Sequence, residues 1–224
     1  MNLNILVLPG DGIGTEVTRE AVRVLQCVAT KWNHALCLTE GLLGGIAIHK
    51  TGSAMPDETA RLALEADATL LGAVGLPEFD QMPPEKRPEK GLLGIRKTLG
   101  VYANLRPVRA FKALADSSPL KNHLLDGVDM IIVRELTGGI YYGTPRGISG
   151  QGDEERAVNT MTYTRAEIAR VSRMAFHLAR QRRKKLTSVD KSNVLENSQL
   201  WRRVVCEVAA DFPDVALDHL LVDN

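Results

Sequence analysis

The alternation of short apolar runs with amphipathic stretches is the feature that most constrains how this chain can fold. Apolar runs typical of strands lie at 4–8, 68–74, 128–136 and 186–192, and helix-like stretches lie between them. Parallel strands need long crossover connections, which are usually helices. The pattern therefore predicts an α/β fold with a largely parallel sheet, in which 128–136 is a buried strand.

Two of the intervening stretches show the spacing of an amphipathic helix. The first follows the run at 4–8, and its expected buried face carries Val17, Ala21, Val24, Leu25 and Val28. The second begins at "TRAE" (164–167), where Thr164 and Glu167 fit a capping box. Its expected apolar stripe carries Ile168, Val171, Ala175 and Leu178.

Composition excludes several classes of function. The net charge is +1, from 28 basic and 27 acidic residues in 224, so we expect neither nucleic acid nor an anionic membrane as a partner. No run is long enough to span a bilayer, and the start lacks the pattern of a signal peptide. Three scattered cysteines favour reduced thiols and a cytoplasmic protein, and the five histidines show no metal-ligand spacing.

The segment "PGDGIGTEV" (9–17) joins the first apolar run to the first helical stretch. A strand, a glycine-rich turn and a helix start can form a phosphate cradle. Counting from Gly10, however, the third glycine of a GxGxxG fingerprint is replaced by Thr15. The pattern leaves two interpretations: a tight turn with close backbone approach, or a nucleotide contact.

Three arginines are candidates for holding a carboxylate. Arg96 and Arg106 lie in one segment, "GLLGIRKTLGVYANLRPVR", and Arg134 follows the apolar run "DMIIV". A guanidinium binds a carboxylate through two parallel hydrogen bonds, and ligands of α/β proteins bind at strand ends. The alternative interpretation is three ordinary structural or surface arginines.

Two further segments carry candidates for proton transfer. Tyr141 and Tyr142 follow a Gly-Gly turn, where a hydroxyl near arginines could donate a proton, although a packing pair on a hairpin fits equally. Lys191 and Asn193 lie at the end of the run at 186–192, and a desolvated lysine can act as a base. The alternative for Lys191 is a surface lysine in a turn.

Six segments, taken together and in order, resemble the isocitrate/isopropylmalate dehydrogenase family of decarboxylating dehydrogenases. They are "PGDGIGTEV", "ADATLLGAVG", "GLLGIRKTLGVYANLRPV", "VDMIIVRELTGGIYYGTPRG", "VDKSNVLENSQLWRRVV" and "LLVDN". The resemblance implies a non-Rossmann α/β fold that binds NAD, uses Mg²⁺ or Mn²⁺, and forms a homodimer with shared active sites. It also implies a larger α/β domain at 1–103, a smaller one at 104–224, and a dimerisation arm near 141–156.

The resemblance implies roles for the matching residues. Arg96, Arg106 and Arg134 would bind the substrate carboxylates, Tyr141 would protonate the carbon left after decarboxylation, and Lys191 would act in deprotonating the 2-hydroxyl. Asp223 would contact the substrate and be one metal ligand, and it and Lys191 would come from the neighbouring subunit. Ile13 in the glycine-rich turn, Glu89 and Asn193 would lie near the nicotinamide.

Leu92 and Leu93, just before Arg96, bear on the substrate. Related isocitrate dehydrogenases have a serine in this region that meets a third carboxylate. Leucines cannot pair a charge, but they suit a branched alkyl group, whose burial gains about 1–3 kcal/mol. We therefore expect 3-isopropylmalate rather than isocitrate as substrate, with tartrate or malate enzymes as an alternative.

Two departures from the family pattern qualify this prediction. Leu76 stands where the family usually has glycine, which we expect to alter a loop near the cofactor. The sequence also ends at "LLVDN", whereas family members carry further metal-binding aspartates and an adenosine-binding loop. We therefore expect an incomplete fold and a chain that is inactive alone, with a non-catalytic, dimerising fragment as the alternative.

Overall fold

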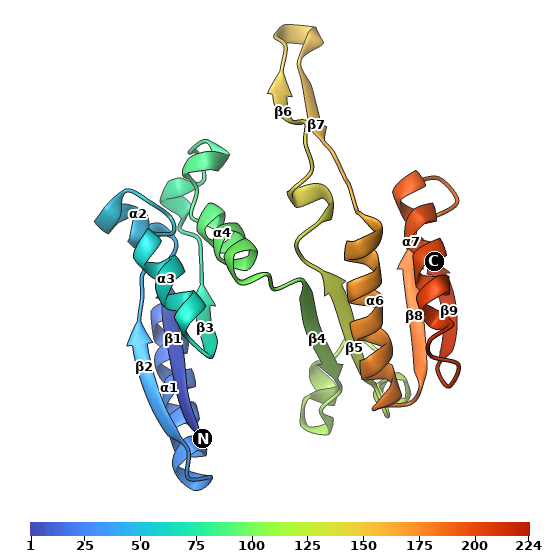
Figure 1. Cartoon of the computed structure of the whole chain (residues 1–224), viewed down its shortest axis with the longest axis horizontal. Coiled ribbons are helices and arrows are strands. Elements are labelled where there is room, and N and C mark those ends of the chain that lie inside the picture. The colour runs from blue at the N-terminus through green and yellow to red at the C-terminus, as the bar shows by residue number, and fades with distance from the viewer. The chain divides into compact units, whose positions relative to one another are not determined.

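A computed structural model describes all 224 residues, and the chain divides into two compact units, Met1–Gly100 and Val101–Asn224 (Figure 1). The boundary lies close to the one expected at 103/104. That these units are the larger and the smaller domain of the family stays a prediction. None of the helices combines the length and the apolar character that crossing a bilayer requires.

The first unit is built on a parallel three-stranded sheet in the order β2–β1–β3. Its strands are β1 (Asn2–Gly10), β2 (Ala35–Glu40) and β3 (Ala68–Ala73). Its helices are α1 (Gly14–Lys31), α2 (Gly45–Thr51), α3 (Asp57–Glu65) and α4 (Glu89–Leu99). Strand, helix and strand therefore alternate as the sequence predicted.

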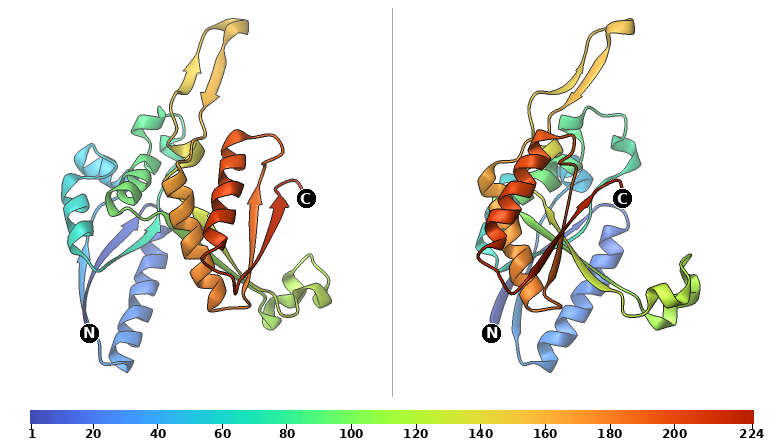
Figure 2. Two further views of the ribbon diagram at one scale, coloured as in Figure 1. Left: turned by 45° about the vertical axis from the view of Figure 1, so that its right-hand side comes forward. Right: turned by 90° about the vertical axis from the view of Figure 1, so that its right-hand side faces the viewer.

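The core of the first unit follows the two-residue period of β1. Leu6 and Leu8 are fully buried and pack in one cluster with Ala63 of α3 and Ile95 of α4. The residues that alternate with them point to the opposite face of the sheet. Figures 1 and 2 show α1 on one side of the three strands, and α3 and α4 on the other.

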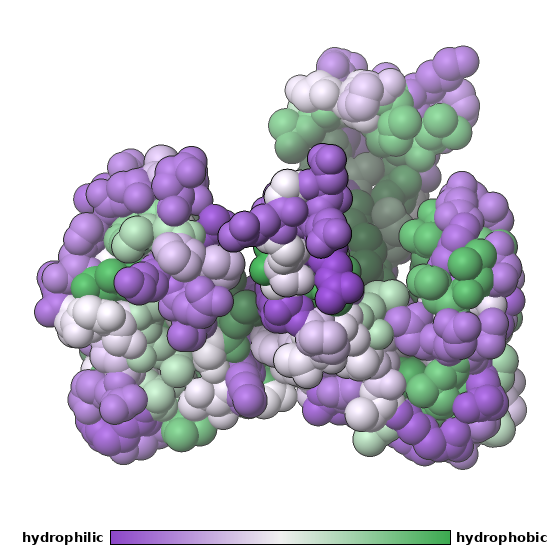
Figure 3. Space-filling model, turned by 90° about the horizontal axis from the view of Figure 1, so that it is seen from above, coloured by the Kyte–Doolittle hydropathy of each residue, from purple (hydrophilic) through white to green (hydrophobic).

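The predicted buried face of α1 is only partly correct. Val17, Val24 and Val28 are 49%, 63% and 47% exposed, and the helix instead buries Gly14, Thr18 and Ala29. The reason is close packing: a side chain at Gly72 of β3 would come within 2.4 Å of the Thr18 hydroxyl, so only small residues fit there. Apolar surface is visible on both units (Figure 3).

Besides an isolated hairpin, the second unit contains two separate strand pairs and two packed helices. The strands of these two pairs are β4 (Ala103–Arg109), β5 (Asp129–Glu135), β8 (Lys185–Asp190) and β9 (Ala216–Leu221). Its helices are the short α5 (Asn122–Leu125), α6 (Arg165–Arg180) and α7 (Glu196–Ala209). β8 and β9 are parallel, whereas β4 and β5 are antiparallel.

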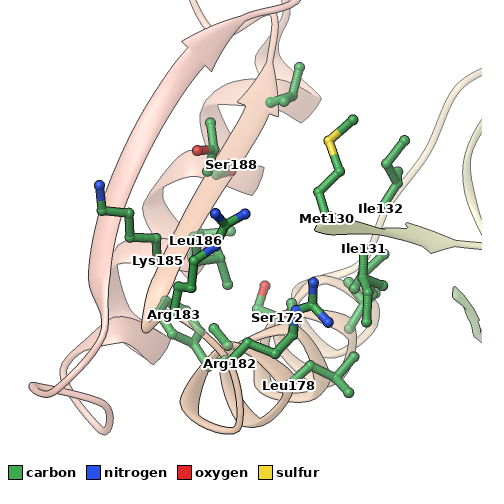
Figure 4. A pocket seen from close by; sticks show the side chains of 18 of the residues that line it. Met130, Ile131, Ile132, Ser172, Leu178, Arg182, Arg183, Lys185, Leu186 and Ser188 are labelled. Carbon is green, nitrogen blue, oxygen red and sulfur yellow. The ribbon is translucent and has the colours of Figure 1, made fainter. Parts of the chain in front are cut away.

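The expectation of a buried parallel strand at 128–136 is therefore wrong in this structure. β5 pairs on one side only, and Met130 and Ile132 are each 50% exposed. Its other side borders an apolar hollow of about 610 Å³, which α6 and β8 also line (Figure 4). None of the predicted site residues lines this hollow.

The helices of the second unit form its core. α6 begins with the predicted capping box, in which the Thr164 hydroxyl accepts from the Glu167 N–H and the Glu167 carboxylate accepts from the Thr164 N–H. Ile168 and Phe176 of α6 are fully buried against α7. Of the stripe predicted for this helix, Ile168 and Val171 are buried, whereas Ala175 and Leu178 are half-buried and line the hollow.

The glycine-rich segment after β5 forms an isolated hairpin. β6 (Arg146–Ser149) and β7 (Arg156–Asn159) pair antiparallel, and every residue of both strands is exposed. Figures 1 and 2 show this hairpin projecting from its unit. A lone two-stranded ribbon is marginally stable in water. The hairpin is the predicted arm in shape, and its role in dimerisation stays a prediction.

Candidate active site

The glycine-rich turn after β1 is a place of close backbone approach. Gly10 has a φ of +73°, and a Cβ there would lie 1.9 Å from the Ala73 carbonyl oxygen. A Cβ at Gly14 would lie 2.2 Å from the Pro9 carbonyl oxygen. The tight-turn interpretation is confirmed, and a contact between this turn and a nucleotide stays a prediction.

Asp11 anchors this turn to two neighbouring loops. Its carboxylate is buried and accepts hydrogen bonds from the backbone N–H groups of Gly45, Ile46 and Gly75, each at 2.8 Å. Two of the donors lie at the N-terminus of α2, where backbone N–H groups favour an anion. The turn, the start of α2 and the loop after β3 are therefore held as one assembly.

The predicted cofactor residues of the first unit border that assembly. Ile13 precedes α1 and is 60% exposed, and Glu89 is the exposed first residue of α4. A Cβ at Gly75 would lie 3.2 Å from a Glu89 carboxylate oxygen, so the loop that Asp11 holds runs beside Glu89. Leu76 packs near Gly12 and Gly45, which a glycine at that position would not do.

The two predicted specificity leucines have different surroundings on α4. Leu92 packs against the core cluster of the first unit, together with Leu99. Leu93 is half-buried outside that cluster, and Arg96 lies one helical turn further on. Leu93 is therefore the better placed of the two to meet a ligand beside Arg96.

In the second unit, the strand register brings Arg106 and Arg134 to one face. Asn104 of β4 lies directly opposite Arg134 of β5, so their side chains share a face, and Arg106 lies on the same face two residues along. The Arg106 Nε donates to the Asn104 side-chain oxygen at 2.6 Å. The two guanidinium groups are diagonal neighbours, as two groups binding one dicarboxylate would be.

Tyr141 lies next to one of these arginines, Arg134. It ends a short 3₁₀ helix, Gly139–Tyr141, and the residue is 52% exposed. The Arg134 guanidinium carbon lies 5.3 Å from the centroid of that ring, within the range of a cation–π contact. The fold therefore places a phenol hydroxyl and two cations in one part of the second unit.

Lys191 and Asp223 meet at the C-terminal edge of the other strand pair. Asp190, the last residue of β8, lies opposite Leu221, the last residue of β9. Just beyond these ends, the Lys191 ammonium donates to the Asp223 carboxylate. The carboxyl ends of parallel strands are where α/β proteins bind ligands. Asn193 follows in the same turn, which a Lys191 carbonyl closes by accepting from the Val194 N–H.

Asp190 holds the turn that carries Lys191. Its buried carboxylate accepts from the Ser192 N–H at 2.9 Å and from the Arg202 guanidinium at 2.9 and 3.1 Å. Burial opposes ionisation of Asp190, but the Arg202 guanidinium and the Ser192 groups outweigh it and lower the pKa below its usual value. The carboxylate is therefore ionised and locked in place.

Within one chain, these two groups of residues stay apart. No hydrogen bond, ion pair or ring contact joins Arg106, Arg134 or Tyr141 to Lys191 or Asp223. The resemblance assigns the second group to the neighbouring subunit's site, and that assignment stays a prediction.

The residues present do not form a complete metal site. The structure contains no cluster of three or more histidine, cysteine, aspartate or glutamate side chains that could hold a metal ion. Mg²⁺ requires about six oxygen ligands, and Asp223 supplies one carboxylate, which here pairs with Lys191. That Asp223 is a metal ligand stays a prediction.

Sequence reasoning missed three carboxylates that hold the site residues: Asp11, Glu135 and Asp190. All three are buried, and each lies within two residues of a predicted site residue. The signal was available, because each acidic side chain stands at the end of an apolar run, where a charge needs a partner.

The α/β fold, the glycine-rich turn without a GxGxxG fingerprint and the arginine pair agree with the class of dehydrogenase that the sequence resembles. A family model described as "Isocitrate/isopropylmalate dehydrogenase" matches residues 4–224. The chain belongs to the isocitrate/isopropylmalate dehydrogenase family, which confirms the resemblance and the α/β fold class predicted from the sequence.

Curated relatives and solved structures agree with this assignment. The chain is 58% identical over 223 residues to a 3-isopropylmalate dehydrogenase of Geobacillus kaustophilus, covering 100% of this chain and 60% of the relative. It is 55% identical to that of Halalkalibacterium halodurans, covering 100% and 62%. An isocitrate dehydrogenase from Methylococcus capsulatus matches with a TM-score of 0.82 and 29% identity, covering 99% of this chain and 61% of that one. The chain thus spans about 60% of the length of these curated relatives.

Proposed function

We propose that this protein serves the NAD-dependent oxidative decarboxylation of (2R,3S)-3-isopropylmalate to 4-methyl-2-oxopentanoate and CO₂, a step of leucine biosynthesis. The observation that carries the proposal is the grouping of Arg106, Arg134 and Tyr141 on one face of the second unit. The printed names of the relatives support the same reaction.

In the second unit, the arginines would bind the substrate, and Tyr141 and Lys191 would transfer protons. Arg106 and Arg134 would bind substrate carboxylates, which planar guanidinium groups do in a fixed orientation. Tyr141, beside Arg134, would donate its proton to the carbon that loses CO₂. Lys191, in its neutral amine form and released from Asp223, would accept the proton of the 2-hydroxyl, as part of a homodimer with shared sites.

The first unit would hold the cofactor and set the substrate. NAD, when bound, supplies the oxidising chemistry. The open backbone at Gly12 fits a flat ring, because a Cβ there would meet only a Leu76 methyl, at 3.8 Å. Ile13, Glu89 and, from the second unit, Asn193 would line the nicotinamide. Arg96 would contribute to carboxylate binding, and Leu93 would contact the isopropyl group.

The residues present do not complete a metal site. We infer that Asp223 would contribute one oxygen ligand to Mg²⁺ or Mn²⁺ in a full assembly. The same observation favours a second candidate, a non-catalytic chain that associates through its hairpin. Related decarboxylating enzymes for malate or tartrate differ from the first proposal in substrate only.

Two proteins test these proposals: the 224-residue chain, and a chimera that joins it to the remaining part of the Geobacillus relative. NADH formation is followed with 3-isopropylmalate, isocitrate, malate and tartrate, with Mg²⁺ or Mn²⁺ present. We expect turnover by the chimera with a preference for 3-isopropylmalate. No turnover, or a preference for isocitrate, contradicts the first proposal, and turnover by the 224-residue chain itself contradicts the second.

A further inference from the structure

The strand that carries Arg134 also carries a buried carboxylate on its other face. Glu135 follows Arg134 in β5, and its side chain is 1% exposed. Successive residues of a strand point to opposite faces, so Arg134 and Glu135 face opposite ways. A buried carboxylate needs several donors to offset the loss of hydration.

Glu135 receives those donors from the turn that leads to Tyr141. One carboxylate oxygen accepts from the Thr137 N–H at 2.9 Å and from the Gly138 N–H at 2.7 Å. The other accepts from the Thr137 hydroxyl at 2.9 Å and from the Arg170 guanidinium at 3.1 Å. These hydrogen bonds hold the turn after β5 against the end of the strand.

Arg170 of α6 links this turn to the rest of the unit. Its guanidinium also donates to the Thr137 hydroxyl and lies 4.7 Å from the centroid of the Tyr102 ring. The Tyr102 carbonyl in turn accepts from the N–H of Leu136, within the same turn. One cation thus braces the turn from the helix.

The backbone at Gly139, which leads to Tyr141, is restricted by close packing. Its φ is +76°, and a Cβ there would lie 2.3 Å from the Tyr163 hydroxyl oxygen. Its N–H donates to the Thr162 carbonyl at 2.8 Å. Tyr141 lies two residues later, so the anchored turn determines the position of its ring relative to Arg134.

We propose that Glu135, braced by Arg170, is a positioning residue that holds Tyr141 against Arg134. The expected effect on turnover rests on the proposed function, whereas the positioning of Tyr141 by Glu135 does not depend on it. Arg134 is held by the strand ladder, whereas Tyr141 lies outside the ladder at the end of the turn, where its carbonyl also accepts from the Arg146 guanidinium at 2.6 Å. Loss of the anchor should therefore impair proton transfer more than substrate binding.

The test compares Glu135→Gln and Arg170→Met with Arg173→Met, a control on the same helix whose exposed ion pair with Asp211 lies outside the turn. The glutamine keeps the shape, but in either orientation its N–H₂ faces hydrogen-bond donors of Glu135. Arg170→Met removes one of the four donors to Glu135 and leaves the carboxylate in place, so it answers the question if the first variant fails to fold. NMR on the 224-residue chain measures amide exchange at Thr137 and Gly138 and the contact between the Arg134 side chain and the Tyr141 ring.

We expect faster exchange and a weakened Arg134–Tyr141 contact in both variants and not in the control. In the chimera, kcat should fall about 100-fold for Glu135→Gln, the loss expected from a small misplacement of a reacting group, with KM for 3-isopropylmalate little changed. An unchanged contact overturns the proposal, and so does an equal fall of kcat in all three variants. A wild-type chimera without turnover contradicts the proposed function alone, because the NMR result still decides the positioning role.

Discussion

The guanidinium carbon of Arg134 lies 5.3 Å from the centroid of the Tyr141 ring. A residue of β5 and a residue of the following turn thus form a pair, although seven positions separate them. A cation over an aromatic face is attracted by the ring quadrupole. The pair places a fixed positive charge beside a hydroxyl that the family resemblance assigns to proton donation.

Tyr141→Phe removes the hydroxyl and keeps the ring, so it tests the role of the hydroxyl alone. Phenylalanine retains the aromatic face, so the contact with Arg134 and the fold should persist. If the hydroxyl donates a proton in the reaction, kcat of the chimera should fall about 100-fold or more, with KM little changed. Steady-state kinetics and thermal unfolding measure the two effects. Wild-type kcat in the variant would show that the hydroxyl has no part in the chemistry.

Several features of the fold could be predicted from local sequence patterns. The capping box at Thr164 and Glu167 requires only residues three apart, and it forms as predicted. The buried face of α1 could not be predicted in this way. Val17 and Val28 satisfy the helical period, yet the contact with Gly72 selects the face that carries Thr18. Which face packs depends on a strand far away in the sequence.

In the candidate site, too, some features could be predicted from local sequence and others depend on distant contacts. Arg134 and Tyr141 were singled out because of their place after an apolar run and a glycine turn, and the structure brings them together. The register that sets Arg106 beside Arg134 depends on antiparallel pairing of β4 with β5, whereas the apolar run predicted a parallel strand. The three donors to Asp11 are backbone N–H groups, and Glu135 takes two of its four donors from the backbone. The sequence therefore indicates that these buried charges need partners, but not which groups supply them.

Leu93→Ala and Leu92→Ala form a matched pair that tests substrate choice. Leu93 lies outside the core cluster, so its truncation should raise KM for 3-isopropylmalate about 10-fold and leave the unfolding midpoint nearly unchanged. Leu92 packs in the cluster, so its truncation should lower the free energy of unfolding by about 2 kcal/mol. Kinetics of the chimera and urea unfolding of both variants measure this. The reverse pattern would assign substrate contact to Leu92.

Asp190→Asn tests the anchor of the Lys191 turn. The variant leaves the Arg202 guanidinium and the Ser192 N–H without a charged acceptor, which should lower the free energy of unfolding at neutral pH by about 1–3 kcal/mol. Asp214→Asn is the control, because the Arg180–Asp214 pair is more exposed and should contribute about 1 kcal/mol or less.

The stabilisation by Asp190 should also depend on pH, with a definite sign. Because folding lowers the pKa of Asp190, its contribution is complete above the unfolded-state pKa of about 3.9 and is lost as the pH falls through the folded-state value. The stability difference between wild type and Asp190→Asn should therefore shrink on acidification below about pH 4. Urea unfolding across this range measures it. A difference that is constant in pH would show that the carboxylate charge is not what stabilises the turn.

Ile148→Asp tests whether the hairpin associates with a second copy of the chain. Ile148 is 73% exposed on β6, where it contributes nothing to the core, so a charge there should leave the unfolding midpoint unchanged. If two hairpins bury this residue against one another, the aspartate would be desolvated without a partner and the dimer should weaken about 10-fold or more. Ser149→Asp places the same charge on the opposite face of the same strand and is the control. Sedimentation equilibrium of the three proteins measures association, and equal behaviour of all three would contradict a role for this face of the hairpin.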